Sequence, residues 1–168
     1  MCLAACTSSA PRSRDTAPIL ITGDSIGPVP ARGTAAQLRR ASQVVRDTVE
    51  EGIEAVPESI IVISVRGDTV RAAMDSGRAY RLSVTSPRFR TADSIGPGTS
   101  LSRLLRDPRV FALTGEGEAW VALPTHCGLR CALNDAGSLG DRSDSVGVKE
   151  LRTLPPATSV REVLAFGC

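Results

Sequence analysis

Apolar residues along the chain follow two different spacings, and each spacing predicts its own kind of element. The first spacing, an interval of three or four residues, is carried by Leu38, Ala41, Val45 and Val49. This interval is typical of the apolar stripe of a helix, so we predict one long helix over residues 34–51. A second, short helix is expected over residues 100–106. It should end before Pro108, because the residue ahead of a proline disfavours helical geometry.

After each predicted helix, apolar and polar residues alternate, which is the pattern of a half-buried strand. The first strands are expected over 59–65, 69–74 and 80–84, with a tight turn at 66–68. The second set of strands is expected at 110–113, at 119–123 extended by 127–133, and at 159–166. Residues 134–144 are polar and glycine-rich, so we expect an exposed loop there.

A short motif occurs twice and indicates a duplicated unit. The run Asp-Ser-Ile-Gly-Pro stands at 24–28 and again at 93–97, and each copy precedes a Gly-Thr step at the start of a predicted helix. In this step the threonine, Thr34 or Thr99, is expected to cap the helix.

The aspartates of the repeated motif, Asp24 and Asp93, are expected to cap their own turns through their carboxylates. We place the two repeats at about 18–86 and 87–168, inside a single domain at 18–168. The predicted fold class is α+β: two helix-β-β-β repeats that form a largely antiparallel sheet, with the helices on one face.

Composition argues against nucleic acid as a partner. The formal net charge is only +2, the charges of both signs are interspersed, and aromatic residues make up 3% of the chain. A nucleic-acid surface needs a basic patch or a series of aromatic stacking residues. We therefore expect neither DNA nor RNA as a ligand.

The segment Leu3-Ala4-Ala5-Cys6 resembles the lipobox of bacterial lipoproteins. The resemblance implies that Cys6 is lipidated and becomes the mature N-terminus, so that residues 1–6 are the end of a signal peptide. Residues 7–17 are polar and rich in Ser, Thr and Arg, as expected of a flexible tether. The protein is therefore expected to lie in the bacterial cell envelope, lipid-anchored to a membrane and facing the periplasm. No charged and apolar leader precedes the box, so we expect either that the reading frame begins further upstream or that this sequence has been trimmed at its start.

An oxidising periplasm would pair two of the three remaining cysteines, Cys127, Cys131 and Cys168. Cys127 and Cys131 fall on one face of a predicted strand, about 13 Å apart, which is beyond the roughly 7 Å reach of a disulfide. We predict a Cys127–Cys168 disulfide, with Cys131–Cys168 as the alternative and the third thiol buried. A zinc site made of His126 and the three cysteines is a further alternative, although no CxxC motif supports it.

One short segment of the sequence matches a motif of catalytic serines in hydrolases. Residues 23–27 read Gly-x-Ser-x-Gly, which would make Ser25 a nucleophile with His126, the only histidine, as its base. The motif requires a helix directly after the serine, whereas prolines follow here, so we expect a structural turn and no catalytic residue. No cofactor and no metal ion are expected. Trp120 and Tyr80 are candidate contacts for a partner, although Trp120 in the core is the alternative that we favour.

The duplicated units, the Gly-Thr helix start and the lipobox together resemble small envelope lipoproteins with repeats of the β-lactamase-inhibitor-protein type. They also resemble lipoprotein families with a Gly-Ile-Gly-Pro corner. The resemblance implies an architecture and a non-enzymatic binding or structural role, with a protein or a cell-wall component as partner. A periplasmic enzyme inhibitor is the second hypothesis, and it predicts a concave sheet with Trp120, Tyr80 and arginines. A serine hydrolase that uses Ser25 is the third.

Overall fold

The computed structural model describes residues 17–51, 56–115 and 117–168. The elements of the first half are β1 (Ile19–Leu20), β2 (Ser25–Ile26), β3 (Val29–Pro30), α1 (Ala35–Ala41), β4 (Gln43–Glu51), β5 (Pro57–Val65), β6 (Asp68–Asp75) and β7 (Arg78–Val84). Those of the second half are β8 (Phe89–Arg90), α2 (Leu101–Leu104), β9 (Phe111–Gly115), β10 (Glu118–Ala122), β11 (Leu129–Leu133), η2 (Gly137–Leu139), β12 (Ser145–Gly147), α3 (Val148–Leu151) and β13 (Val160–Ala165).

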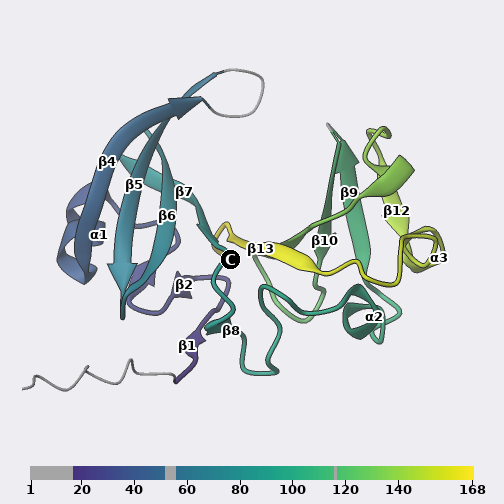
Figure 1. Ribbon diagram of the computed structural model, residues 1–168. Helices are drawn as coiled ribbons and strands as arrows, with labels where there is room; N and C mark the ends of the chain where they lie inside the picture. Colours follow the sequence, from purple (N-terminus) through teal and green to yellow (C-terminus); the bar gives the residue numbers. More distant parts are fainter. Residues whose placement is uncertain (1–16, 52–55, 116) are drawn as a thin grey trace, which may run out of the picture.

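Within these residues the fold is dominated by one nine-stranded sheet in the order β12-β9-β10-β11-β13-β7-β6-β5-β4. Each pair of neighbouring strands is antiparallel. The two halves of the chain meet at the centre, where β13 pairs with β7 and Leu164 lies opposite Ser83. Figure 1 shows β4 to β7 on one side of β13 and β9, β10 and β12 on the other. A second link is the short parallel pair of β1 with β8.

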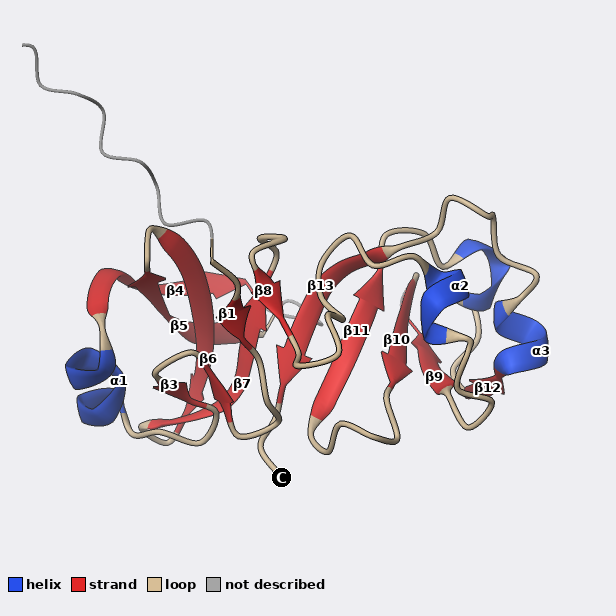
Figure 2. Ribbon diagram, turned by 90° about the horizontal axis from the view of Figure 1, so that it is seen from below, coloured by secondary structure: helices blue, strands red, loops and turns tan. Residues whose placement is uncertain are grey.

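The predicted α+β class is wrong, because the protein is mostly β. The described helices are short, and they do not form one layer over the sheet: α1 lies at one end of the molecule, while α2 and α3 lie at the other (Figure 2). The units are therefore not helix-β-β-β repeats. In the first half four strands follow the helix, and in the second half β12 and α3 are added before the last strand.

The long helix predicted over 34–51 is also wrong. Helix α1 ends at Ala41, Ser42 takes an extended conformation, and the chain continues as the edge strand β4. β4 is rich in β-branched residues, which lose side-chain freedom in a helix and favour a strand. Of the stripe that predicted the helix, only Leu38 is fully buried, while Val45 and Val49 are exposed.

The strands predicted in the first half are confirmed as β5, β6 and β7, each slightly longer than expected. The continuous strand predicted through 119–133 is wrong, since the chain turns back between β10 and β11. Backbone hydrogen bonds from His126 to Leu123 and from Leu129 to His126 form this turn, and the two strands then pair antiparallel. Cys127 therefore lies in a turn, and Cys131 lies in a strand.

The main core lies on one face of the sheet. There the strands pack against the segments that carry the repeated motif and against the helices. Its fully buried members include Ile26, Leu38 and Phe89 together with Ile63 and Leu82 of the sheet. Because α1 and the irregular segments cover this face, the opposite face is left for other contacts. Among the described helices none is long and apolar enough to cross a membrane.

Candidate functional site

The open face of the sheet carries a groove that spans both halves of the molecule. Its volume is about 550 Å³. We call it the sheet groove, and its lining residues are Glu51, Glu58, Ile60, Arg71, Ala73, Arg81, Ser83, Glu118, Trp120, Arg161, Glu162 and Leu164. These side chains come from β4 to β7 and from β10 and β13. The central β7–β13 pair therefore forms the bottom of the groove, and residues far apart in the sequence face one another across it.

The floor of the sheet groove is apolar and closely covered. Ile60 and Ala73 are each 2% exposed, and with Val62 they form a small cluster separate from the main core. Leu164 and Ser83 continue the floor across the central strand pair. Long arginine and glutamate side chains shield such a floor with their methylene stems while their charged ends stay in water. The groove therefore presents mainly its charged walls, with the apolar floor beneath them.

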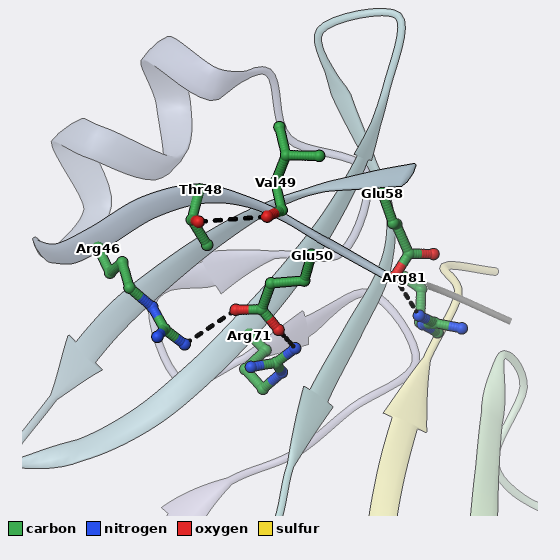
Figure 3. Close-up of polar contacts among 7 residues, drawn as sticks. All are labelled: Arg46, Thr48, Val49, Glu50, Glu58, Arg71 and Arg81. Atoms are coloured by element: carbon green, nitrogen blue, oxygen red, sulfur yellow. Dashed lines mark hydrogen bonds and ion pairs between the residues drawn. The ribbon is translucent and has the colours of Figure 1, made fainter. Parts of the chain in front are cut away.

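The walls of the groove are built from arginine–glutamate pairs. Arg71 donates to Glu50 at 2.7 Å and Arg81 donates to Glu58 at 2.8 Å. Figure 3 shows both pairs, with Glu50 also accepting from Arg46. On the other half, one nitrogen of Arg161 lies 3.0 Å and 2.9 Å from the two carboxylate oxygens of Glu118.

The pair with Arg71 holds Glu50 in its charged form. The hydrogen bond from Arg71 lowers the pKa of Glu50 below its usual value, although burial acts in the opposite direction. A carboxylate that accepts hydrogen bonds from guanidinium groups keeps its charge further into acid. The groove walls therefore carry fixed charges of both signs at neutral pH.

Trp120 lies in the sheet groove and is half-buried, so the core position that we favoured for it is wrong. Tyr80 lies outside the groove on β7, where it is 40% exposed. Its hydroxyl donates to Glu58, and the guanidinium of Arg81 lies 5.5 Å from the centre of its ring. The structure thus places one aromatic candidate in the groove and the other just beyond the Arg81–Glu58 wall.

Cys127 and Cys168 come together at one edge of the molecule. The Cys168 side chain forms a hydrogen bond with Cys127, and this contact raises the pKa of the Cys168 thiol to about 11. Both are exposed, unbonded thiols in the structure. The backbone amide of Cys168 donates to Asp24 at 2.9 Å, and the amide of Gly167 donates to the carbonyl of Gly23 at 3.0 Å. The predicted disulfide is not formed in the structure and stays a prediction.

Cys131 does not share a face with Cys127, contrary to our prediction. It points into the main core, is fully buried and lies opposite Val163 in the β11–β13 ladder. Burial raises the pKa of its thiol to about 12. Cys168 lies beyond the end of β13, where its sulfur and the carbonyl of Cys127 both approach Gly23, so the alternative Cys131–Cys168 pairing has no geometric support.

The two copies of the repeated motif use their aspartates for tertiary contacts, whereas we predicted turn caps. Asp24 holds the C-terminal amide of Cys168. Asp93 accepts from the Thr91 hydroxyl at 2.5 Å and lies 3.2 Å from Nε2 of His126. Burial opposes ionisation of Asp93, but the hydrogen bonds from Thr91 and His126 outweigh it and lower its pKa.

The hydrolase hypothesis gains no support from these contacts. The Ser25 hydroxyl lies 3.1 Å from that of Thr22, and the His126 ring pairs with Asp93 of the second motif. The described residues also contain no group of three or more histidine, cysteine, aspartate or glutamate side chains that could hold a metal ion. The predicted lipidation site, Cys6, lies outside the described residues.

The sequence alone did not reveal the charged walls of the sheet groove. A signal for them was present, since strand alternation puts Glu58 and Ile60 of β5 on the same face. The same alternation puts Arg71 with Ala73 on β6. The strands were predicted, but the face that each charged side chain occupies was not. The partners of the charges depend on register, which hydrophobic alternation does not fix between strands with two mixed faces.

These features define a mostly β protein with one large antiparallel sheet and a charged groove on its open face. No protein-family model matches the chain, and no curated protein matches it. Among solved structures it is similar to the crystal structure of the uncharacterized protein yfeY from Escherichia coli. The TM-score is 0.63 at 10% sequence identity, over 88% of this chain and 99% of that one. At this identity the likeness concerns the fold alone.

Proposed function

We propose that the protein is a bacterial envelope lipoprotein, anchored through Cys6, whose sheet groove binds a partner without catalysing a reaction. The single observation that carries the binding role is the sheet groove itself. It joins an apolar floor, charged walls and the only tryptophan of the chain on one open sheet face. Partly exposed aromatic and arginine side chains around an apolar centre are typical of protein interfaces. The proposed location in the cell envelope rests on the lipobox at residues 3–6.

The binding role is tested by photo-crosslinking in living bacteria that express the whole reading frame. A benzoylphenylalanine at position 120 lies in the groove, and one at Val49 is the control, because Val49 is 64% exposed at the sheet edge. We expect a discrete adduct from position 120 and none from position 49. Equal labelling from both positions, or none from position 120, would contradict a role for the groove.

The proposed lipid anchor at Cys6 is tested by measuring the intact mass of the protein from the same strain. A product that begins at Cys6 and carries acyl chains is expected. An unlipidated product that keeps residues 1–5 would reject the anchor while leaving the crosslinking result to stand by itself.

A periplasmic enzyme inhibitor is the second candidate, and one observation favours it. This hypothesis predicts a concave sheet with Trp120, Tyr80 and arginines. The groove combines Trp120 with three arginines, while Tyr80 lies just outside it. The purified protein should then inhibit a periplasmic hydrolase at a one-to-one molar ratio, and Trp120→Ala should weaken that inhibition. Full residual activity of every hydrolase in a periplasmic extract, with the protein in excess, would reject it.

A further inference from the structure

The charges that line the sheet groove do not balance. Each of its three arginines is held by its own glutamate, in the pairs Arg71–Glu50, Arg81–Glu58 and Arg161–Glu118. The remaining lining carboxylates are Glu51 and Glu162. Within the described part of the chain neither of these two side-chain carboxylates forms a hydrogen bond or ion pair. The charge that the groove leaves uncompensated is therefore negative.

Glu162 lies close to Trp120 in the same row of the sheet. Ala132 of β11 pairs with Trp120 on one side and with Glu162 on the other. Residues directly opposite one another in a ladder point to the same face, and two strand spacings separate the outer pair by about 10 Å. Ala132, whose side chain is a single methyl group, lies between them in this row, and the Arg161–Glu118 ion pair spans the same two outer strands beside it. The space above Ala132 is thus bounded by an aromatic ring and a free negative charge.

We propose that this space receives a lysine or arginine side chain from an extended basic segment of a partner protein. A cation gains from the face of an indole ring and from a charge-assisted hydrogen bond to a carboxylate, and the two contacts act together on one group. The uncharged floor beyond, at Leu164 and Ser83, takes the uncharged residues of the same segment. The proposal rests on the proposed binding role of the groove and adds the chemistry of the ligand.

The test uses Trp120 as its own reporter, because it is the only tryptophan in the chain. A capped peptide with alternating lysine and valine is titrated against the whole protein, and its glutamate–valine counterpart is titrated in parallel. The lysine peptide is expected to change the fluorescence of Trp120 in a saturable way, and the glutamate peptide is expected to leave it unchanged. Added salt should weaken the lysine peptide, since part of its attraction is between charges near the surface.

The matched variants are Glu162→Gln and Asp141→Asn. Each removes one negative charge, but Asp141 is an exposed residue outside the groove. Glu162→Gln should weaken the lysine peptide by roughly fivefold to tenfold, a loss in the range of a charge-assisted hydrogen bond. Asp141→Asn should stay within about twofold of the unchanged protein, as expected for a distant, screened charge. Equal melting temperatures for the two variants show that Glu162→Gln is folded.

Three outcomes would overturn the proposal. They are binding of the glutamate peptide as tight as that of the lysine peptide, equal effects of the two substitutions, and tighter binding of an amine-bearing cell-wall peptide than of the lysine peptide. If position 120 still forms a crosslinked adduct in cells, only the basic character of the partner has failed. If the adduct is missing as well, the proposed binding role fails with it.

Discussion

The C-terminus is bound to the first repeated motif through hydrogen bonds to Asp24 and Gly23. The close approach there requires a glycine at position 23. A Cβ atom added to Gly23 would lie 1.9 Å from the carbonyl oxygen of Cys127 and 2.5 Å from the sulfur of Cys168. The second copy of the motif has Ala92 at the corresponding place. The difference between the two copies is therefore explained by what packs against the first one.

Replacing Gly23 by alanine should lower the free energy of unfolding by about 1–3 kcal/mol, because backbone atoms of the Cys127 turn would have to move. Gly115→Ala is the control, since the nearest atom to a Cβ there is an ordinary 3.8 Å away. Urea unfolding of both variants measures the difference. Equal stability of the two proteins would show that the close approach at Gly23 is not maintained in solution.

The adjacent thiols of Cys127 and Cys168 should form a disulfide when the protein is exported to an oxidising compartment. Peptide mapping without reduction should find these two cysteines linked and Cys131 as a thiol that reacts only after unfolding. Cys168→Ser should lower Tm by roughly 5–15 °C under oxidising conditions, because the crosslink restricts the unfolded chain. Under reducing conditions that difference in Tm should largely disappear, and a linked peptide containing Cys131 would contradict the predicted pairing.

At the scale of elements, the two short helices that follow the repeated motif begin differently. Thr34 and Gln37 form a reciprocal capping box on α1, with hydrogen bonds of 3.2 Å and 2.8 Å. The corresponding N-cap of α2 is Ser100, one residue after the threonine that we predicted. Its hydroxyl caps no backbone amide of the helix and lies 3.1 Å from the Ser102 hydroxyl. Thr99 instead accepts from the amide of Gly96.

Thr34→Ala should cost about 1 kcal/mol of stability, because the backbone amide of Gln37 at the start of α1 loses the hydroxyl oxygen to which it donates. Ser100→Ala should cost less than about 0.5 kcal/mol. Thermal unfolding of the two variants side by side provides the measurement. A cost for Ser100→Ala as large as that for Thr34→Ala would show that both helices depend on a side-chain cap.

At the scale of elements, some strands could be predicted from the sequence and others could not. The strands β5, β6 and β7 were predicted because each combines alternation with a run of β-branched or apolar residues. β4 was missed because its valines happen to continue the helical spacing of Leu38, and spacing alone cannot tell that Val45 and Val49 are exposed. Trp120 was named as a candidate contact, but Glu162 beside it was not. Their proximity follows only from the pairing of both residues with Ala132.

Within the large sheet the two halves are joined by one pair of strands, β7 with β13, but the halves also share one main core. That core draws Ile19 and Leu38 from the first half and Leu101 and Leu151 from the second. Burial common to both halves makes their folding interdependent. We therefore expect the two halves to unfold together.

The chain carries a separate optical reporter in each half, Tyr80 in β7 and Trp120 in β10. Urea unfolding curves recorded from the tyrosine and the tryptophan should have the same midpoint and slope, as expected for a single transition. Two separate midpoints would contradict this expectation and would mean that each half is stable by itself.

Acid should destabilise the whole molecule through its paired carboxylates. Hydrogen bonds from Arg109 lower the pKa of Asp107 to about 2. The pKa of Glu50 is likewise lowered by Arg71, and the pKa of Asp144 is lowered by Arg142. The folded state therefore binds fewer protons than the unfolded state in acid. Its advantage is complete above the ordinary carboxyl pKa near 4 and is lost as the pH falls toward 2. Unfolding free energies measured from pH 6 to pH 2.5 should decline over this window, and Asp107→Asn should decline less steeply.

The short parallel pair of β1 with β8 has a mechanical consequence. If the protein is anchored to a membrane through its amino end, a force that pulls on a bound partner is transmitted first to Ile19 and Leu20. These two residues pair with Phe89 and Arg90. Phe89 is fully buried and sits directly after the first half of the chain. The force would therefore act first where the two halves of the chain meet and would reach both halves. It would not act first on the edge strand β4 and peel that strand from the sheet.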